Sequence, residues 1–388
     1  MGGKLEGSSF FSSSSSKRRR RPNNDYAKRT KTCSCSHGPK QHLYLALDDW
    51  NGGYSIHKLG IDDILDHRAV GGGEHKHNLL EEAAAIRITS PVPGRPMAFA
   101  ALGTTIFIGT NPRSHEERAP PTLVYDTKAG AVTVGPPVPN KLCDLSSAMA
   151  VGETLYALTS VPFPEWSSLQ ALSWAPTAVR YPQPWDPAME WSWNTVPSPL
   201  PPPYDGIDIV AYALHPDGHT IFMSTGISTR SLDTRNGVWK DLGDWVLPFR
   251  GQAFFDANLD AWVGLHHVED GYVCCCPVVS RRTAATRSPE CRILVEKLIH
   301  RKEVPKHWAC LRGKDTSLTY MGDSSYAFVE NILRSEDFKH GSVLHITLFS
   351  LRYDHKGDLR TKVRHATRSY QVSKNTPMWG FSHAAFWM

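Results

Sequence analysis

Two clusters of cysteine and histidine are the residues of this chain best suited by type to bind a metal ion. The first, Cys33–His37 (CSCSH), offers three ligands, but its Cys-x-Cys spacing is tighter than the about two to four intervening residues of zinc sites, and no second ligand pair follows nearby. The second is Cys274–Cys276, near His266, His267 and Glu269. Consecutive side chains on a strand alternate between faces, so three successive cysteines cannot all reach one ion. We therefore expect no metal site and interpret Cys274–Cys276 as small buried hydrophobic residues.

Sequence motifs for catalysis are absent. The chain contains no Gly-x-Ser-x-Gly elbow, phosphate-binding loop or dinucleotide fingerprint, and no obvious pair of catalytic carboxylates. His215–Gly218 (HPDG) has the composition of a hairpin turn in which Asp217 accepts hydrogen bonds from the backbone. We predict no catalytic residue and no cofactor.

A basic block near the N-terminus has the composition of a targeting signal. Clustered cations in a flexible tail fit an acidic groove on an importin, or nucleic acid. The same Ser- and Arg-rich, acid-poor composition fits an organellar transit peptide. We predict nuclear import, with an importin as partner and a location in the nucleus and/or cytoplasm; a plastid or mitochondrion is the alternative. The cations are Lys17, Arg18, Arg19, Arg20, Arg21, Lys28, Arg29 and Lys31.

The charge outside this block argues against a nucleic-acid groove on the rest of the chain. The formal net charge is +5, and the eight cations of the block more than account for it. No stretch approaches the roughly 20 apolar residues of a membrane helix, and Ser12–Ser16 stands where a secretory signal would have an apolar core. We expect no membrane and no nucleic-acid partner, and free thiols in a reducing compartment.

A proline-rich segment matches a peptide ligand. Pro201, Pro202 and Tyr204 fit the Pro-Pro-x-Tyr pattern recognised by WW domains, in a segment that favours polyproline II geometry. The alternative is a stiff loop that links two structural units. The nearby Trp185, Trp191 and Trp193 offer either a binding patch or packing between those units.

A recurring phrase organises the remainder of the chain: a short apolar run, a tight polar turn, and a second run rich in β-branched and aromatic residues. It occurs at Met97–Thr110, Ser146–Thr159 and Ile209–Thr225, with weaker copies at Gln252–Leu265 and Ser317–Glu330. Such spacing predicts repeated antiparallel hairpins, and hence a β-propeller.

A second hairpin, with an Asp-containing turn, follows several of these copies. It occurs at Thr122–Gly135, Ser228–Leu242 and His345–Val363, and two hairpins make one four-stranded blade. The last residues, Gly380–Met388, read as an inner strand that pairs with strands near His42–Leu59 and closes the ring. We predict about six blades, with five or seven as alternatives, over residues 42–388, after a disordered tail over residues 1–41. Leu79–Arg87 is expected to be a short helix in a loop.

The strand ends Tyr125–Thr127 and Leu232–Thr234, each followed by a glycine, resemble kelch-type blades, although the kelch double glycine is missing from the inner hairpins. As a whole, His42–Met388 resembles a large plant family, expanded in grasses, that is defined as a domain of unknown function. Its members share a strand like Tyr54–Leu59 and an ending like Gly380–Phe386. The resemblance implies a propeller and transfers no catalytic residue.

The rigid repeats and the lack of a chemical motif favour a non-enzymatic scaffold that binds another protein. Residues 1–41 lack the apolar helical pattern of an F-box, so assembly into a ubiquitin ligase is not supported. The alternative is an enzyme or small-molecule binder with its site at the mouth of the propeller channel, because a fold can assemble a site from distant loops.

Overall fold

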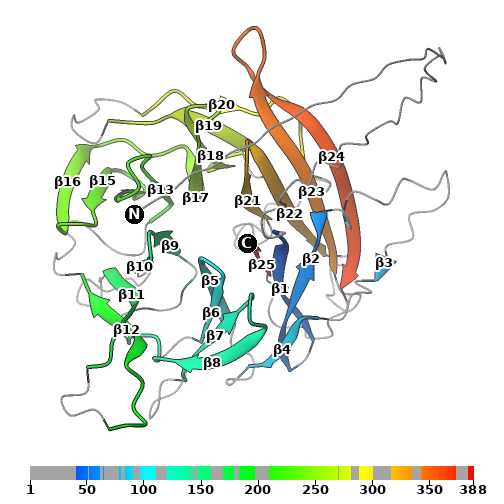
Figure 1. Ribbon diagram of the computed structural model, residues 1–388. Coiled ribbons are helices and arrows are strands. Elements are labelled where there is room, and N and C mark those ends of the chain that lie inside the picture. The colour runs from blue at the N-terminus through cyan, green and yellow to red at the C-terminus, as the bar shows by residue number, and fades with distance from the viewer. Residues whose placement is uncertain are drawn as a thin grey trace, which may run out of the picture. The chain divides into compact units, whose positions relative to one another are not determined.

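The computed structural model shows an all-β protein built from four-stranded antiparallel sheets (Figure 1). The chain divides into two units, Met1–Lys40 and Gln41–Met388. No helix among the described residues is long and apolar enough to cross a membrane. The residues that the structure describes are 41–50, 52–61, 64, 78–79, 84–90, 97–110, 120–140, 142, 145, 147–158, 169–178, 183–196, 209–269, 271–280, 288–299, 316–333, 342–372 and 383–388.

The strands of the unit Gln41–Met388 form six blades, numbered here in chain order. In each blade the strands run from the inner to the outer edge. Blade 1 consists of β25 (His383–Trp387), β1 (Leu43–Trp50), β2 (Gly53–Leu59) and β4 (Ile86–Thr89). Blade 2 consists of β5 (Met97–Leu102), β6 (Thr105–Thr110), β7 (Thr122–Asp126) and β8 (Ala131–Gly135). Blade 3 consists of β9 (Ala148–Val151), β10 (Thr154–Leu158), β11 (Leu169–Pro176) and β12 (Met189–Thr195).

The second half of the unit repeats this plan, with two additional strand pairings. Blade 4 consists of β13 (Ala211–Leu214), β14 (Thr220–Ser224), β15 (Thr229–Asp233) and β16 (Val238–Gly243). Blade 5 consists of β17 (Phe249–Asp256), β18 (Ala261–His266), β19 (Val273–Pro277) and β20 (Arg292–Ile293). Blade 6 consists of β21 (Thr316–Gly322), β22 (Ser325–Leu333), β23 (Ser342–Tyr353) and β24 (Leu359–Val372). The short β3 (Asn78–Leu79) pairs in parallel with β24, and β13 pairs in parallel with β17, so that blades 4 and 5 form one eight-stranded sheet.

The predicted hairpins are confirmed. The five recurring phrases correspond to the pairs β5–β6, β9–β10, β13–β14, β17–β18 and β21–β22, which are the two inner strands of blades 2 to 6. The second hairpins correspond to β7–β8, β15–β16 and β23–β24. The helix expected over Leu79–Arg87 is wrong at both ends, because Leu79 lies in β3 and Ile86 begins β4.

The hydrophobic core shows how the blades are arranged relative to one another. Six clusters of buried side chains each join two consecutive blades: blades 1 and 2, 2 and 3, 3 and 4, 4 and 5, and 5 and 6, with the sixth joining blade 6 to blade 1. A chain of contacts that returns from the last blade to the first defines a ring. The strands alternate side chains between two faces, and both faces of a blade are therefore buried against its neighbours.

The C-terminal strand completes the first blade. Strand β25 pairs antiparallel with β1 from Leu43 opposite Trp387 to Leu47 opposite His383. Two further backbone bonds join His42 and Met388, at 2.6 and 3.1 Å. Blade 1 is therefore built from both ends of the described unit, as Gly380–Met388 predicts.

Turns within one blade are tied to each other. Asp126 Oδ1 accepts hydrogen bonds from the backbone N–H groups two and three residues ahead, at 2.8 and 3.1 Å. The next residue, Thr127, donates from its N–H and its hydroxyl to the carbonyl of Thr104 in the β5–β6 turn, at 2.9 and 2.7 Å. Thr234 makes the same pair of bonds to the carbonyl of His219 in blade 4, at 3.0 and 2.8 Å. The Asp-Thr repeat thus joins the second turn of a blade to its first.

A buried carboxylate connects blades 5 and 6. Asp256 is fully buried at the end of β17. It accepts hydrogen bonds from Ser324 Oγ and the Tyr326 hydroxyl of blade 6, both at 2.8 Å, and from the N–H groups of Asn258 and Leu259, at 3.0 and 3.2 Å. Burial and the Asp256 charge raise the pKa of Tyr326, which keeps this phenol a neutral donor. Four donors on one carboxylate offset its desolvation.

We predict that Asp256→Ala lowers the free energy of unfolding by about 3 kcal/mol, because it leaves several buried donors without an acceptor. Chemical denaturation measures the change. Asp244→Ala is the matched control, since Asp244 is exposed in the connection between blades 4 and 5, and is expected to stay within about 0.5 kcal/mol of wild type. Equal effects of the two substitutions would contradict the role assigned to Asp256.

Candidate functional site

The inner strands of all six blades line a hollow of about 480 Å³. Strands β5, β9, β13, β17, β21 and β25 each contribute residues to its wall, and Figure 1 shows these strands on the inner side of the ring. Much of the wall is alanine, which leaves space where larger side chains would fill the centre. The hollow's alanines are Ala100, Ala101, Ala148, Ala150, Ala384 and Ala385.

Polar side chains gather on one part of this wall, where β17, β21 and β25 meet. Arg250 Nη2 donates to Thr316 Oγ1 at 2.7 Å. Ser317 Oγ and His383 Nε2 lie 3.0 Å apart. Thr319 Oγ1 donates to the backbone carbonyl of β25 at Ala385, at 3.2 Å. These bonds connect blades 5, 6 and 1 across the hollow's wall.

A bulge in β17 accounts for the position of Arg250. The pairing of β17 with β18 shifts between Arg250 and Phe254, and the intervening Gly251–Ala253 pairs in parallel with β13 instead. Gly251 has φ +72°, a conformation that glycine adopts at little cost. Across the bulge, a Cβ at Gly264 would lie 2.8 Å from Phe249, so glycine is required for the close approach. Bulges that redirect a side chain are common next to functional sites.

His383 is uncharged at neutral pH. Its side chain lies in the interior of the ring, where desolvation lowers the pKa to about 4 from the usual 6.5. Within the described part of the chain, its Nδ1 has no hydrogen-bond partner. The neutral imidazole offers one donor and one acceptor, and Ser317 engages one of them.

The lining residues of the hollow carry one permanent charge. Arg250 is a cation, and none of the described residues on the wall is Asp or Glu. Among the described residues, no group of three or more His, Cys, Asp or Glu is arranged to hold a metal ion. The arrangement suits the binding of a polar molecule better than acid–base chemistry, which needs a group that titrates near the working pH.

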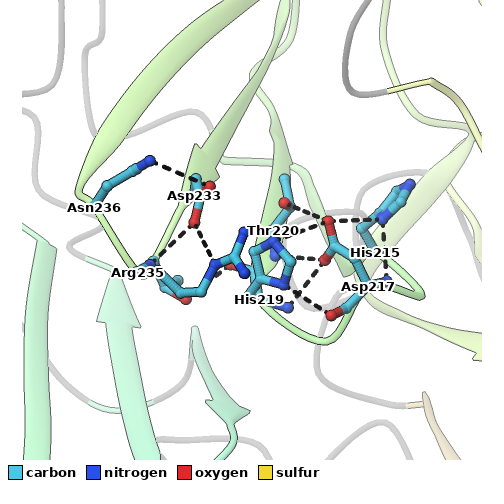
Figure 2. Close-up of polar contacts among 8 residues, drawn as sticks. His215, Asp217, His219, Thr220, Asp233, Arg235 and Asn236 are labelled. Carbon is cyan, nitrogen blue, oxygen red and sulfur yellow. Dashed lines mark hydrogen bonds and ion pairs between the residues drawn. The ribbon is translucent and has the colours of Figure 1, made fainter.

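A second polar cluster, on the β13–β14 turn, is used by the fold (Figure 2). Asp217 accepts hydrogen bonds from the N–H groups of His219 and Thr220, at 3.0 and 2.9 Å, and from the Thr220 hydroxyl at 2.7 Å. His215 Nδ1 lies 3.1 Å from the same carboxylate. Burial alone would raise the pKa of Asp217, but these hydrogen bonds lower it to about 2. Asp217 therefore serves the backbone of the turn, as the sequence predicts.

The β11–β12 hairpin, called the tryptophan hairpin below, carries four tryptophans from the core to the surface. Trp193 and Trp191 pack against the cluster between blades 2 and 3, where Trp191 meets Phe107 edge-to-face with ring centroids 4.8 Å apart. Trp174 lies opposite Trp191, with centroids 5.3 Å apart, and is 52% exposed. Trp185, in the connection between the two strands, is 79% exposed. Both sequence alternatives hold, one for each half of the set.

The three successive cysteines lie on opposite faces of β19. Cys275 packs in the cluster between blades 5 and 6, and its thiol lies 3.4 Å from the Tyr353 hydroxyl. Cys274 and Cys276 pack in the cluster between blades 4 and 5. Burial raises the pKa of all three thiols, whereas a hydrogen bond with Cys274 lowers the pKa of the partly exposed Cys291. Strand alternation separates Cys275 from its two neighbours, as expected from the sequence.

Several predicted sites lie outside the described residues. These are the basic block from Lys17 to Lys31, the Cys33–His37 cluster, and the Pro-Pro-x-Tyr segment at Pro201, Pro202 and Tyr204. Conversely, sequence reasoning did not single out Arg250, Ser317 or His383. The available signals were the glycine after Arg250 within an apolar strand, and the alanines of the inner strands, which indicate a wall with space beside it.

The fold and the hollow together define a six-bladed β-propeller with a lined central cavity. The chain belongs to the family described as "Protein of unknown function (DUF1668)", whose model matches residues 40–370. No curated protein matches the chain.

Solved structures give distant similarities. The chain is similar to a chain of a nidogen/laminin complex, at 10% identity and TM-score 0.43, covering 89% of this chain and 98% of that one. It is also similar to a putative 6-phosphogluconolactonase from Bacteroides uniformis ATCC 8492, at 11% identity and TM-score 0.43, covering 87% and 85%. A third is the Cps50 (Swd1) β-propeller domain of Myceliophteria thermophila, at 10% identity and TM-score 0.36, covering 85% and 84%. We draw no functional conclusion from these similarities.

We predict that His383 makes the protein less stable as the pH falls from about 6.5 to about 4. In this window the unfolded histidine binds a proton and the folded one does not, so protons favour unfolding, by at most about 3 kcal/mol at pH 4. Denaturation of His383→Gln across this range is expected to show a smaller loss than wild type. His355→Gln, which changes an exposed histidine of the β23–β24 turn, should keep the wild-type profile. Parallel profiles for wild type and His383→Gln would refute the prediction.

Proposed function

We propose that this chain is a non-enzymatic scaffold that binds a protein partner through the tryptophan hairpin. The observation that supports this proposal is the exposure of two large indole side chains, at 52% for Trp174 and 79% for Trp185. Tryptophan is strongly enriched among the residues that dominate binding energy at protein interfaces.

The support beneath these side chains favours binding. Trp174 contacts Trp191, which in turn contacts the fully buried Phe107. Two paired strands hold the indoles of Trp174 and Trp191, so little conformational entropy is lost when a partner covers them. Exposed apolar side chains on a rigid base are typical of interaction surfaces.

The charges of the hairpin indicate the chemistry of the partner. Its charged residues within the described ranges 169–178 and 183–196 are Asp186 and Glu190, both acidic. An apolar contact surface flanked by basic residues would complement them, since opposite charges at a rim increase specificity and the rate of association. We therefore propose a partner whose apolar segment lies between lysines or arginines.

We predict that Trp174→Ala together with Trp185→Ala abolishes specific capture of this partner. The full chain serves as bait in an affinity purification with quantitative mass spectrometry. A partner is expected to fall at least about tenfold with the double variant. Ile227→Ala is the matched control because Ile227 is 70% exposed in blade 4, away from the tryptophan hairpin. Equal capture by all three baits, or loss only with the control, would refute the proposed surface.

We further propose that the basic block directs the protein to the nucleus through an importin. The support is the sequence alone: eight cations between Lys17 and Lys31. The likeness of the blades to kelch repeats and to a plant family likewise remains part of the proposal, supported by the equivalent turns at Asp126 and Asp233.

We predict that replacing all eight cations by glutamine lowers the nuclear-to-cytoplasmic ratio of a fluorescent fusion several-fold, because the acidic groove of an importin then has no cation to bind. Replacing Ser12–Ser16 by alanine leaves the cations in place and should not change the ratio. A wild-type fusion found in a plastid or mitochondrion would instead favour the transit peptide, and an unchanged ratio would overturn nuclear import.

A further inference from the structure

We propose that the hollow binds a small organic oxyanion, a carboxylate or phosphate group on a compact apolar body. This site is distinct from the tryptophan hairpin, and the inference goes beyond the scaffold function. The hollow's volume of about 480 Å³ falls in the range of roughly 300–1,000 Å³ that is common for small-molecule sites.

The charge of the wall selects an anion. Arg250 is a permanent cation on the wall, and no Asp or Glu is among the described lining residues. A guanidinium has five N–H donors in a planar fork, and the bond from Nη2 to Thr316 uses one of them. Such a fork matches the two oxygens of a carboxylate or phosphate.

The groups beside Arg250 are neutral and can complete the coordination of an oxyanion. Ser317 and Thr316 contribute hydroxyls, and His383 contributes an uncharged imidazole. Because His383 is already bonded to Ser317 at 3.0 Å, the pair is held in place before a ligand arrives. A preorganised set of donors increases affinity by reducing the cost of ordering.

The opposite part of the wall is apolar and suits a hydrocarbon or aromatic body. Phe99, Phe254, Leu265 and Phe386 line it together with the alanines of the inner strands. A ligand with one anionic head and one apolar end would satisfy both parts of the wall. An inorganic ion alone would leave this apolar surface unused.

The backbone around Arg250 supports a built site. The β17 bulge requires a positive φ at Gly251 and a glycine at position 264, and it breaks the regular pairing of β17 with β18. The cost of this irregular backbone is offset locally by the parallel bonds to β13. The result is that Arg250 and Gln252 line the hollow.

The test uses the full chain and isothermal titration with benzoate, phenyl phosphate and neutral benzamide. Benzoate or phenyl phosphate is expected to bind saturably with millimolar or better affinity, and benzamide at least about tenfold more weakly. The stronger of the two anions identifies the head group. No saturable binding of either anion up to about 10 mM would overturn the proposal.

Variants locate the binding in the hollow. Arg250→Gln is expected to weaken anion binding at least tenfold, while Arg352→Gln, on the exposed face of β23, leaves it unchanged. Should Arg250→Gln fail to fold, Arg250→Lys decides instead, since it keeps the charge and loses the fork. Unchanged affinity in the folded Arg250 variant would refute the site. The Trp174→Ala/Trp185→Ala protein should bind the anion normally, which separates this result from the scaffold proposal.

Discussion

The pairing of β25 with β1 is the interaction on which the rest of the structure depends. Five blades are each formed by a continuous stretch of chain, but blade 1 needs its inner strand from residues 383–387. This strand supplies His383 and Ala385 to the hollow, and blade 1 supplies its β1 leucines to the core with blade 6. The fold and the candidate site are therefore completed by the same backbone hydrogen bonds.

Two surfaces of the propeller differ in their physical character. The hollow is a narrow, enclosed space in which one cation, a neutral imidazole and several hydroxyls face an apolar wall. The tryptophan hairpin is an open surface of aromatic rings with acidic residues beside it. A small molecule and a protein partner can therefore be bound at once without sharing a residue.

Much of the architecture was readable from the sequence, and the hollow was not. Turn residues such as Gly103 and Asp126 act within a few positions of the chain, so the hairpins, the order of the strands and the role of residues 380–388 followed from local patterns. Arg250, Ser317 and His383 come together only because three blades converge on the axis, which no local pattern encodes. Leu79–Arg87 shows the opposite error, because strand pairing with a distant partner overrode a local helix preference.

The parallel pairing of β13 with β17 gives the ring an uneven stiffness. Blades 4 and 5 share one hydrogen-bonded sheet of eight strands, whereas the other neighbouring blades are joined mainly by side-chain packing. Backbone hydrogen bonds fix direction and distance, while apolar contacts allow small sliding movements. Slow breathing of the ring is therefore concentrated at the remaining joints. Arg250 sits on the rigid sector and faces partners on the more compliant one.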